Sequence, residues 1–295
     1  MTEIVVSESE SGSRLDAFLA AHVGSRTAAQ KAISEGRVTV DGESRQKRWI
    51  VSNSEVVRVA SLVPTKREIT PTDVTIPVVW SDSHLAVIDK PIGLVAHPAP
   101  GHPTGTLSQI LEANHPEREI GLVHRLDRDT SGLLVVAFDD STLRDLRSAL
   151  QDRTVVREYT ALVMGHPRSS EGTVDAPIGR DRNSRTRMSI RTDTPRHAVT
   201  HFEVIETLAD ATLLRVRLET GRTHQIRVHL AEVGLPVAGD PVYGKAGAWS
   251  LGRQFLHAAR LSFQHPKTGE LIDLSSPLPE DLESALESAR RGDRP

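Results

Sequence analysis

The chain has 295 residues, of which 38% are hydrophobic and 25% charged, with a formal net charge of -3 at pH 7. This composition is typical of a globular protein, and the absence of cysteine excludes disulfides and thiolate metal sites. The slight acidity argues against a protein that coats nucleic acid without specificity. No apolar run approaches the roughly eighteen residues of a membrane-spanning helix, and the first residues lack the features of a signal peptide. We therefore expect a cytoplasmic protein with no membrane partner.

The first sixty residues predict a small unit of helices and strands. Hydrophobic residues at helical spacing begin at Leu15, and Ser25 and Gly36 are placed to cap and to end a second helix. From the amino terminus we expect helices at 14–19 and 26–35 and strands at 38–40 and 56–59.

This unit resembles the RNA-binding domain of the ribosomal protein S-four type. The resemblance rests on RLD at 14–16, SR at 25–26 and GRVTVDG at 36–42. In that family the face formed by the two helices meets the RNA backbone, so basic side chains here are candidate phosphate contacts. The alternative is an ordinary solvated face. The candidates are Arg26, Lys31, Arg37, Lys47 and Arg48.

A linker and a larger unit are expected to follow. Residues 63–75 contain two prolines and no apolar periodicity, which is typical of a linker. We predict an RNA-binding domain over 1–62, a catalytic domain over 76–287 and a flexible tail over 288–295. In the larger unit we expect strands at 85–89, 133–138, 159–164 and 213–218, and helices carrying Leu143, Leu146 and Leu150, and Ile226, Leu230 and Val233.

The run HRLDRDTSGLL at 124–134 is the most informative feature of the chain. It places Asp127 among two arginines and a histidine, directly before the apolar run 133–138. Because burying unpaired charge is costly, this abrupt change favours a catalytic loop held by a rigid sheet. An ionised Asp127 beside an arginine can act as a base or a nucleophile, whereas the alternative is a surface ion pair.

Two further segments hold candidate site residues. In ETGRTHQIRVH at 219–229, Arg227 flanks the apolar face of the expected helix and can hold a carboxylate there. The alternative is that Arg222 and Arg227 are solvent-exposed charges at the start of that helix. Tyr159, in REY at 157–159, is one of only two tyrosines and is either a base-stacking platform or a core residue.

Five histidines raise the alternative of a metal-dependent hydrolase. The pair His224 and His229 is five residues apart and has no intervening glutamate, unlike the spacing of four in the zincin motif. We therefore expect no metal. The five are His97, His124, His224, His229 and His257.

The run at 124–133 closely resembles the signature of the RluA-type pseudouridine synthases. Four other motifs of that family occur in the right order, one before this run and three after it, and the resemblance spans about residues 13 to 282. The added amino-terminal domain is most similar to the layout of the ribosomal large subunit enzymes of the D type, which the C type shares. The other motifs are DKPIGLVAHP at 89–98, REY at 157–159, GRTHQIRVH at 221–229 and LHA at 256–258.

The resemblance implies an α+β fold: a mixed, mainly antiparallel sheet with flanking helices and a central cleft, plus the small amino-terminal α/β domain. It implies that a uridine of RNA is flipped into the cleft, where its glycosidic bond breaks and C5 becomes bonded to C1′. The family needs no metal, nucleotide or redox cofactor. We expect a monomer whose partner is large-subunit ribosomal RNA, in an assembly particle of the ribosome. The alternatives are transfer RNA as substrate and a noncatalytic RNA-binding assembly factor.

The resemblance also implies roles for single residues. Asp127 matches the essential aspartate, which either attacks carbon or removes the ribose 2′ proton. Arg227 matches the arginine that pairs with it, Tyr159 the tyrosine that stacks on the base, and Leu256 an apolar pocket residue. Arg125, Arg222 and His224 are expected in the substrate pocket. Between 180 and 196, six arginines against two aspartates predict a basic loop or hairpin that grips RNA, through Arg180, Arg182, Arg185 and Arg187.

Overall fold

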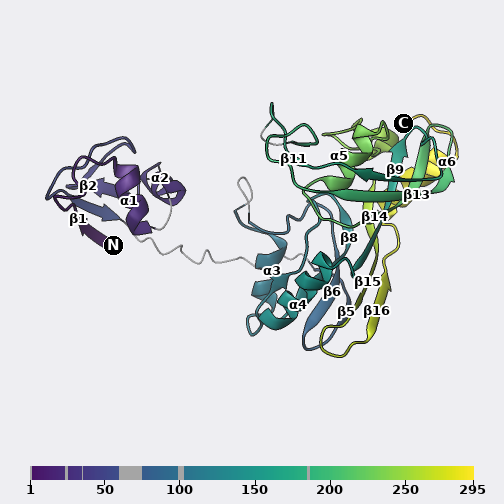
Figure 1. The fold of residues 1–295 in the computed structure, drawn as a ribbon, viewed down its shortest axis with the longest axis horizontal. Coiled ribbons are helices and arrows are strands. Elements are labelled where there is room, and N and C mark those ends of the chain that lie inside the picture. Colours follow the sequence, from purple (N-terminus) through teal and green to yellow (C-terminus); the bar gives the residue numbers. More distant parts are fainter. Residues whose placement is uncertain (1, 24–25, 35, 60–74, 99–102, 185–186) are drawn as a thin grey trace. The chain divides into compact units, whose positions relative to one another are not determined.

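The computed structural model describes residues 2–23, 26–34, 36–59, 75–98, 103–184 and 187–295. The chain divides into two compact units, 1–70 and 71–295 (Figure 1). Ser25, Arg185 and all but the last residue of the expected linker 63–75 lie outside the described residues.

The amino-terminal unit is an antiparallel sheet in the order β1-β4-β2-β3 with two helices. Leu15 and Leu19 of the first helix are fully buried with Val57 and Val59, because the helix turns its apolar face to the sheet. The four expected elements are present, together with the unexpected β1 and β3. The elements are β1 Thr2–Val5, α1 Leu15–Val23, α2 Arg26–Ser34, β2 Val38–Val40, β3 Glu43–Ser44 and β4 Val56–Val59.

The larger unit is built on a ten-stranded sheet. Eight strands follow the order β10-β13-β14-β9-β15-β8-β6-β5, while β16 pairs with β15 and β7 with β8. All pairs are antiparallel except β8 with β15. The strands are β5 Val78–Ser81, β6 Leu85–Lys90, β7 Gly121–Leu122, β8 Ser131–Ala137, β9 Val156–Met164, β10 Glu171–Asp175, β13 Val199–Thr207, β14 Ala211–Leu218, β15 Leu256–Gln264 and β16 Leu271–Ser275.

Helices cover parts of this sheet, and α3 and α4 lie beside the part that contains β5, β6 and β8 (Figure 1). Every residue of β8 is buried, which explains its continuous apolar sequence. Its alternate residues pack into two different hydrophobic clusters, Leu134 in one and Leu133 in the other. The helices are α3 Leu107–Asn114, α4 Asp140–Gln151, α5 Gln225–Glu232 and α6 Glu280–Arg290, with a short 3-10 turn at Ala248–Ser250 and a small hairpin of β11 Gly179–Arg180 with β12 Met188–Ser189.

The parallel contact between β8 and β15 requires a glycine. Gly132 has a φ of +112°, and a Cβ atom there would lie 2.3 Å from the carbonyl oxygen of Ala258. Without a side chain, β8 approaches closely enough for Ser131 to pair with His257 and Gly132 with Ala258. This pairing places the loop before β8 next to the first residues of β15.

Two expectations need correction. Val233 does not share the buried face of α5, because the helix ends at Glu232 and Val233 has a non-helical backbone and is 48% exposed. The flexible tail does not begin at residue 288, because α6 continues to Arg290 and Ala289 extends its buried apolar stripe. Within the described residues, no helix combines the length and the apolar character needed to cross a membrane.

Candidate active site

A cavity of about 410 Å³ opens in the larger unit, within the range of roughly 300–1,000 Å³ typical of ligand sites. Its walls come from the loop between β7 and β8, from β9, from the segment between β14 and α5, and from the start of β15. The structure brings together here all seven residues predicted for catalysis or the substrate pocket. They are Asp127, Arg227, Tyr159, Leu256, Arg125, Arg222 and His224.

The loop that carries Asp127 is held by hydrogen bonds to its backbone carbonyl groups. Thr130 N donates to the Asp127 carbonyl at 3.1 Å, which closes a tight turn. Lys90 Nζ donates to the Arg128 carbonyl at 3.1 Å, and Arg253 Nη1 donates to the Asp129 carbonyl at 3.3 Å. Since the carbonyls of this loop are fixed, the Asp127 carboxylate keeps its place at the cavity with 15% of its side chain exposed.

Lys90 is fully buried at the end of β6, and the sequence interpretation did not single it out. Besides the bond to Arg128, its amine donates to the carbonyls of Pro91 at 2.7 Å and Leu94 at 3.1 Å. Burial lowers the pKa of Lys90 to about 8, against the opposing influence of Asp129 and Asp127. Its three bonds join the loop after β6 to the loop that carries Asp127.

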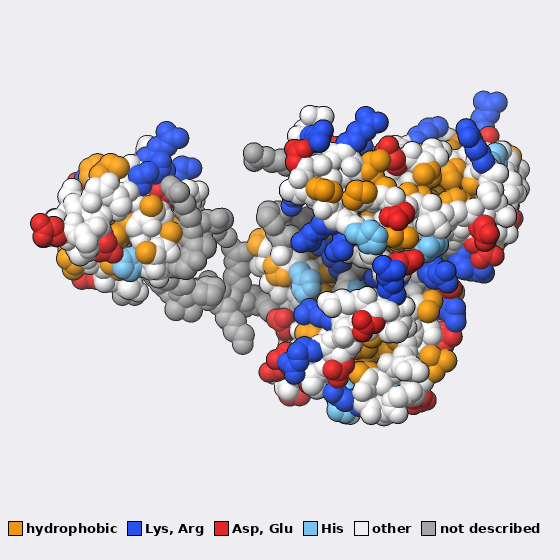
Figure 2. All heavy atoms as spheres, in the orientation of Figure 1, with side chains coloured by type: hydrophobic (Ala, Val, Ile, Leu, Met, Phe, Trp, Pro, Cys, Tyr) orange, Lys and Arg blue, Asp and Glu red, His pale blue; other side chains and the backbone are white. Residues whose placement is uncertain are grey.

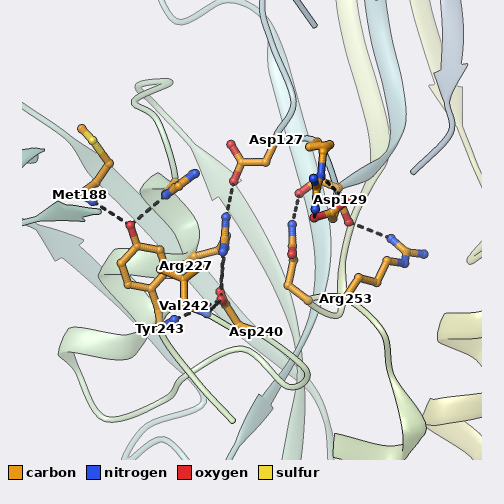
Figure 3. Close-up of polar contacts among 12 residues, drawn as sticks. Asp127, Asp129, Met188, Arg227, Asp240, Val242, Tyr243 and Arg253 are labelled. Atoms are coloured by element: carbon orange, nitrogen blue, oxygen red, sulfur yellow. Dashed lines mark hydrogen bonds and ion pairs between the residues drawn. The ribbon is translucent and has the colours of Figure 1, made fainter. Parts of the chain in front are cut away.

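Arg227 binds two carboxylates at the centre of the site (Figure 3). Its Nη1 donates to Asp127 Oδ2 at 3.0 Å, while Nε and Nη2 donate to the two oxygens of Asp240 at 2.7 and 2.9 Å. Asp240 is completely buried and also accepts the backbone N–H groups of Val242 and Tyr243. The guanidinium therefore forms a bidentate pair with Asp240 through Nε and Nη2, and its Nη1 binds Asp127.

Electrostatics keep this buried pair charged. Burial opposes the charge of Arg227, but the hydrogen bonds to Asp240 and the charges of Asp127 and Asp240 raise its pKa above the ordinary value. Burial likewise opposes the charge of Asp240, and the bonds from Arg227 lower its pKa below the ordinary value. Sequence reasoning missed Asp240 and Tyr243, although the polar segment DPVYG at 240–244 and the scarcity of tyrosine were available signals.

Neighbouring strands supply the apolar wall of the cavity. Tyr159 on β9 is 5% exposed, and burial raises the pKa of its phenol. Leu256 lies on the adjacent strand β15 and is also buried. Arg157, two residues before Tyr159, lines the cavity and donates to the carbonyls of Leu218 and Glu219. The wall thus combines an aromatic ring, an aliphatic side chain and a buried cation.

Gln225, at the start of α5, fixes the segment that carries Arg222 and His224. Its Oε1 accepts from Thr220 Oγ1 at 2.8 Å and from Arg222 N at 2.9 Å. Its Nε2 donates to the carbonyl of Val199 on β13 at 3.0 Å. Through these bonds a neutral buried side chain anchors the cavity wall to the sheet.

In the larger unit, the described arginines that were predicted to contact RNA do not line the cavity. Arg180 is on β11, Arg182 pairs with Asp193 at 2.8 Å, and Arg187 is exposed just before β12, so the basic segment does form a hairpin. Lys and Arg side chains gather around the middle of the larger unit in the face drawn in Figure 2. In the other unit, Arg37 is partly exposed, and the side chains of Arg26 and Lys31 are outside the described set.

Histidines of the larger unit make structural hydrogen bonds. His229 bonds to Thr200 Oγ1 and to the Ala176 carbonyl, and His257 bonds to Ser131 Oγ and the Ser276 carbonyl. In the part of the chain that the structure describes, no group of three or more His, Asp or Glu side chains is placed to hold a metal ion.

Comparison with known proteins identifies the family. Residues 84–232 match the family model described as RNA pseudouridylate synthase, and residues 13–57 match the S4 domain model. The uncharacterized RNA pseudouridine synthase YlyB of Bacillus subtilis is 41% identical over 298 residues, covering 98% of each chain. The chain belongs to the RNA pseudouridylate synthase family. It is therefore an isomerase that acts on RNA, which confirms the predicted enzyme class and leaves the metal-hydrolase and noncatalytic interpretations without support.

Further comparisons support the same assignment. The ribosomal large subunit pseudouridine synthase D of Xanthomonas campestris is 41% identical over 309 residues, covering 98% of this chain and 93% of that protein. The solved structure of human RNA pseudouridylate synthase domain containing 4 superposes with a TM-score of 0.59 at 25% identity, over 72% of this chain and 93% of that chain. The predicted α+β pseudouridine synthase fold with an added amino-terminal domain is confirmed.

Proposed function

We propose that this pseudouridine synthase isomerises uridines of large-subunit ribosomal RNA and that Asp127 is its essential catalytic residue. The observation that carries the proposal is the Asp127 carboxylate at the cavity, with one oxygen held by Arg227 at 3.0 Å. The rRNA target rests on relatives named ribosomal large subunit pseudouridine synthase D that are 41–42% identical over more than nine-tenths of this chain.

The isomerisation breaks the bond between C1′ and N1 and forms a bond between C1′ and C5, while C5 gives up its proton and N1 gains one. An ionised carboxylate can begin this reaction by attacking C1′ or by removing the 2′ proton, and both routes need Asp127 beside the ribose. The Nη1–H donor of Arg227 holds the carboxylate in place and stabilises its charge. No atom enters or leaves overall, so the reaction needs no group donor or oxidant.

The walls of the cavity suit a flipped pyrimidine nucleotide. We assign the ring of Tyr159 to stacking on the base and Leu256 to the opposing apolar contact, since both side chains line the cavity from adjacent strands. Arg125 and Arg222 also line it, and their charge suits the sugar–phosphate backbone. We infer that the basic hairpin and the domain over 1–62 bind the parts of the RNA that lie outside the cavity.

The test compares Asp127→Asn with Asp129→Asn. Both carboxylates are on one loop, but the side chain of Asp129 accepts hydrogen bonds from the exposed Arg128 rather than from Arg227. Each protein is incubated with a large-subunit rRNA transcript containing [5-3H]uridine, and release of tritium from C5 is measured. We expect Asp127→Asn to lose at least about a thousandfold in rate, as expected for removal of a base or nucleophile, and Asp129→Asn to stay within a few fold. Substantial turnover by Asp127→Asn would overturn its catalytic role.

Carbodiimide mapping of pseudouridine in total RNA, from cells with and without the protein, tests the substrate. Loss of sites in large-subunit rRNA supports the proposal. Loss of sites in transfer RNA alone would contradict the rRNA target and leave the isomerase assignment in place.

A further inference from the structure

Tyr243, the second tyrosine of the chain, joins the basic hairpin to the active-site cavity (Figure 3). Its Oη accepts the backbone N–H of Met188 on β12 at 2.8 Å and contacts His224 Nδ1 at 2.8 Å. Its ring lies 5.1 Å from the guanidinium of Arg227 and 5.2 Å from that of Arg187. The same residue thus contacts the hairpin, the cavity wall and the partner of Asp127.

The hydrogen bonds of this hydroxyl favour one tautomer of His224. A phenol has one hydrogen to donate, and its oxygen already accepts from Met188 N–H. When that one hydrogen is directed at His224, Nδ1 accepts it and the imidazole carries its own proton on Nε2. Burial lowers the pKa of His224 against the opposing charge of Asp127, and the charge of Arg227 adds to the lowering, which favours the neutral ring that this arrangement needs.

The backbone of His224 also marks it as a constrained residue. It precedes α5 with a φ of +56°, in the left-handed region that residues other than glycine enter at a cost. Its side chain lines the cavity, and among the described residues the only hydrogen-bond partner of that side chain is Tyr243. The surrounding contacts hold this backbone so that the ring stays at the cavity, where no described residue binds Nε2.

We propose that Tyr243 is a positioning residue for the isomerisation and that it holds His224 as an Nε2–H donor to a carbonyl oxygen of the flipped uracil. This inference rests on the proposed function. When the bond between C1′ and N1 breaks, its electron pair stays with uracil and spreads onto the carbonyl oxygens. A donor already fixed at one of these oxygens stabilises the charge as it develops, so its contribution is to kcat more than to KM.

The first test determines the tautomer of His224 in the protein without substrate. In full-length protein labelled with 15N-histidine, two-bond proton–nitrogen spectra distinguish a ring protonated on Nε2 from one protonated on Nδ1, and His224→Gln assigns the signal. We expect His224 in the wild type to be protonated on Nε2. In Tyr243→Phe, which keeps the ring beside Arg227, we expect a mixture of tautomers. An unchanged tautomer in Tyr243→Phe would overturn the proposal.

The second test uses tritium release from the [5-3H]uridine-labelled large-subunit rRNA transcript. We expect Tyr243→Phe and His224→Gln each to lower kcat about tenfold with KM within about twofold, and the double variant to be no slower than His224→Gln. A wild-type kcat in Tyr243→Phe, or losses that multiply in the double variant, would overturn the proposal. If the wild type releases no tritium, the proposed function fails, and the tautomer spectra alone decide the role of Tyr243.

Discussion

At the scale of single residues, Arg227 divides its donors between a fully buried carboxylate and one at the cavity. Asp240 receives two of its N–H groups and is completely buried, whereas Asp127 receives one and faces the cavity. The two aspartates therefore differ in what their removal does. Losing Asp240 leaves a buried cation without its bidentate partner, and losing Asp127 does not.

We predict that Asp240→Ala lowers the free energy of unfolding by about 3–5 kcal/mol, the cost typical of breaking one side of a buried ion pair. Asp127→Asn should lower it by less than about 1 kcal/mol, because the amide oxygen can still accept the bond from Arg227. Urea denaturation followed by circular dichroism measures both. Equal losses in the two variants would contradict this division of roles.

The lowered pKa of Lys90 predicts that the free energy of unfolding rises with pH in the alkaline range. Its pKa is about 8 when folded and 10.5 ordinarily, so between these values the unfolded chain binds the proton and the folded chain does not. The free energy of unfolding should rise by up to about 3 kcal/mol from this group as the pH increases from 8 to 10.5. The measurement is the difference in unfolding free energy between wild type and Lys90→Met at about pH 7.5 and about pH 10, on either side of most of this change. A difference that does not change with pH would refute the prediction.

At the scale of elements, the contact between β8 and β15 depends on Gly132. Gly132→Ala should lower the free energy of unfolding by about 3 kcal/mol or more, since the residue would be strained at its positive φ and the methyl group would overlap the backbone of Ala258. Gly252→Ala is the matched control, because a Cβ atom there meets nothing within 4 Å. Thermal denaturation of both variants checks this, and similar melting temperatures would count against a required close approach.

Local patterns predicted much of this architecture. The strands predicted at 213–218 and 133–138 correspond to β14 and β8, and in β14 the apolar Leu214, Val216 and Leu218 alternate with two exposed arginines. Both signals arise from side chains near in sequence that share one environment, so a single chain suffices to detect them.

Long-range partners could not be predicted in the same way. Nothing local indicates that β8 pairs in parallel with β15, or that Asp240 rather than solvent satisfies Arg227 from thirteen residues away. The resemblance to a known family supplied Asp127, Tyr159 and Arg227, and the cavity contains all three. It included Lys90 in the motif at 89–98 without giving it a role and did not include Tyr243, and the hydrogen bonds of both depend on the folded packing of loops.

At the scale of the whole molecule, each unit has its own hydrophobic core. The amino-terminal core includes Leu15, Leu19 and Val57, and no described residue beyond 59 belongs to it. Since the larger unit has separate cores, we expect it to fold without the smaller one. The active-site cavity is lined entirely by residues of the larger unit.

We therefore predict that deleting residues 1–62 spares the chemistry and weakens RNA binding. The truncated protein should keep its melting temperature within a few degrees and release tritium from a short RNA at a rate close to that of the full chain. Its affinity for large-subunit rRNA should fall, and the salt dependence of binding should become shallower by about 0.7–0.9 for each phosphate that the protein no longer neutralises. Filter binding at several salt concentrations measures this. Unchanged affinity and slope would mean that the unit does not hold the RNA.

The bidentate pair between Arg227 and Asp240 also has a practical consequence. Because this pair stabilises the centre of the site by itself, we expect Asp127→Asn to keep the binding site intact and to lose turnover. Such a protein can serve as bait. The variant would be cross-linked to RNA in living cells, and sequencing of the bound RNA would identify the transcripts that the active protein modifies and releases.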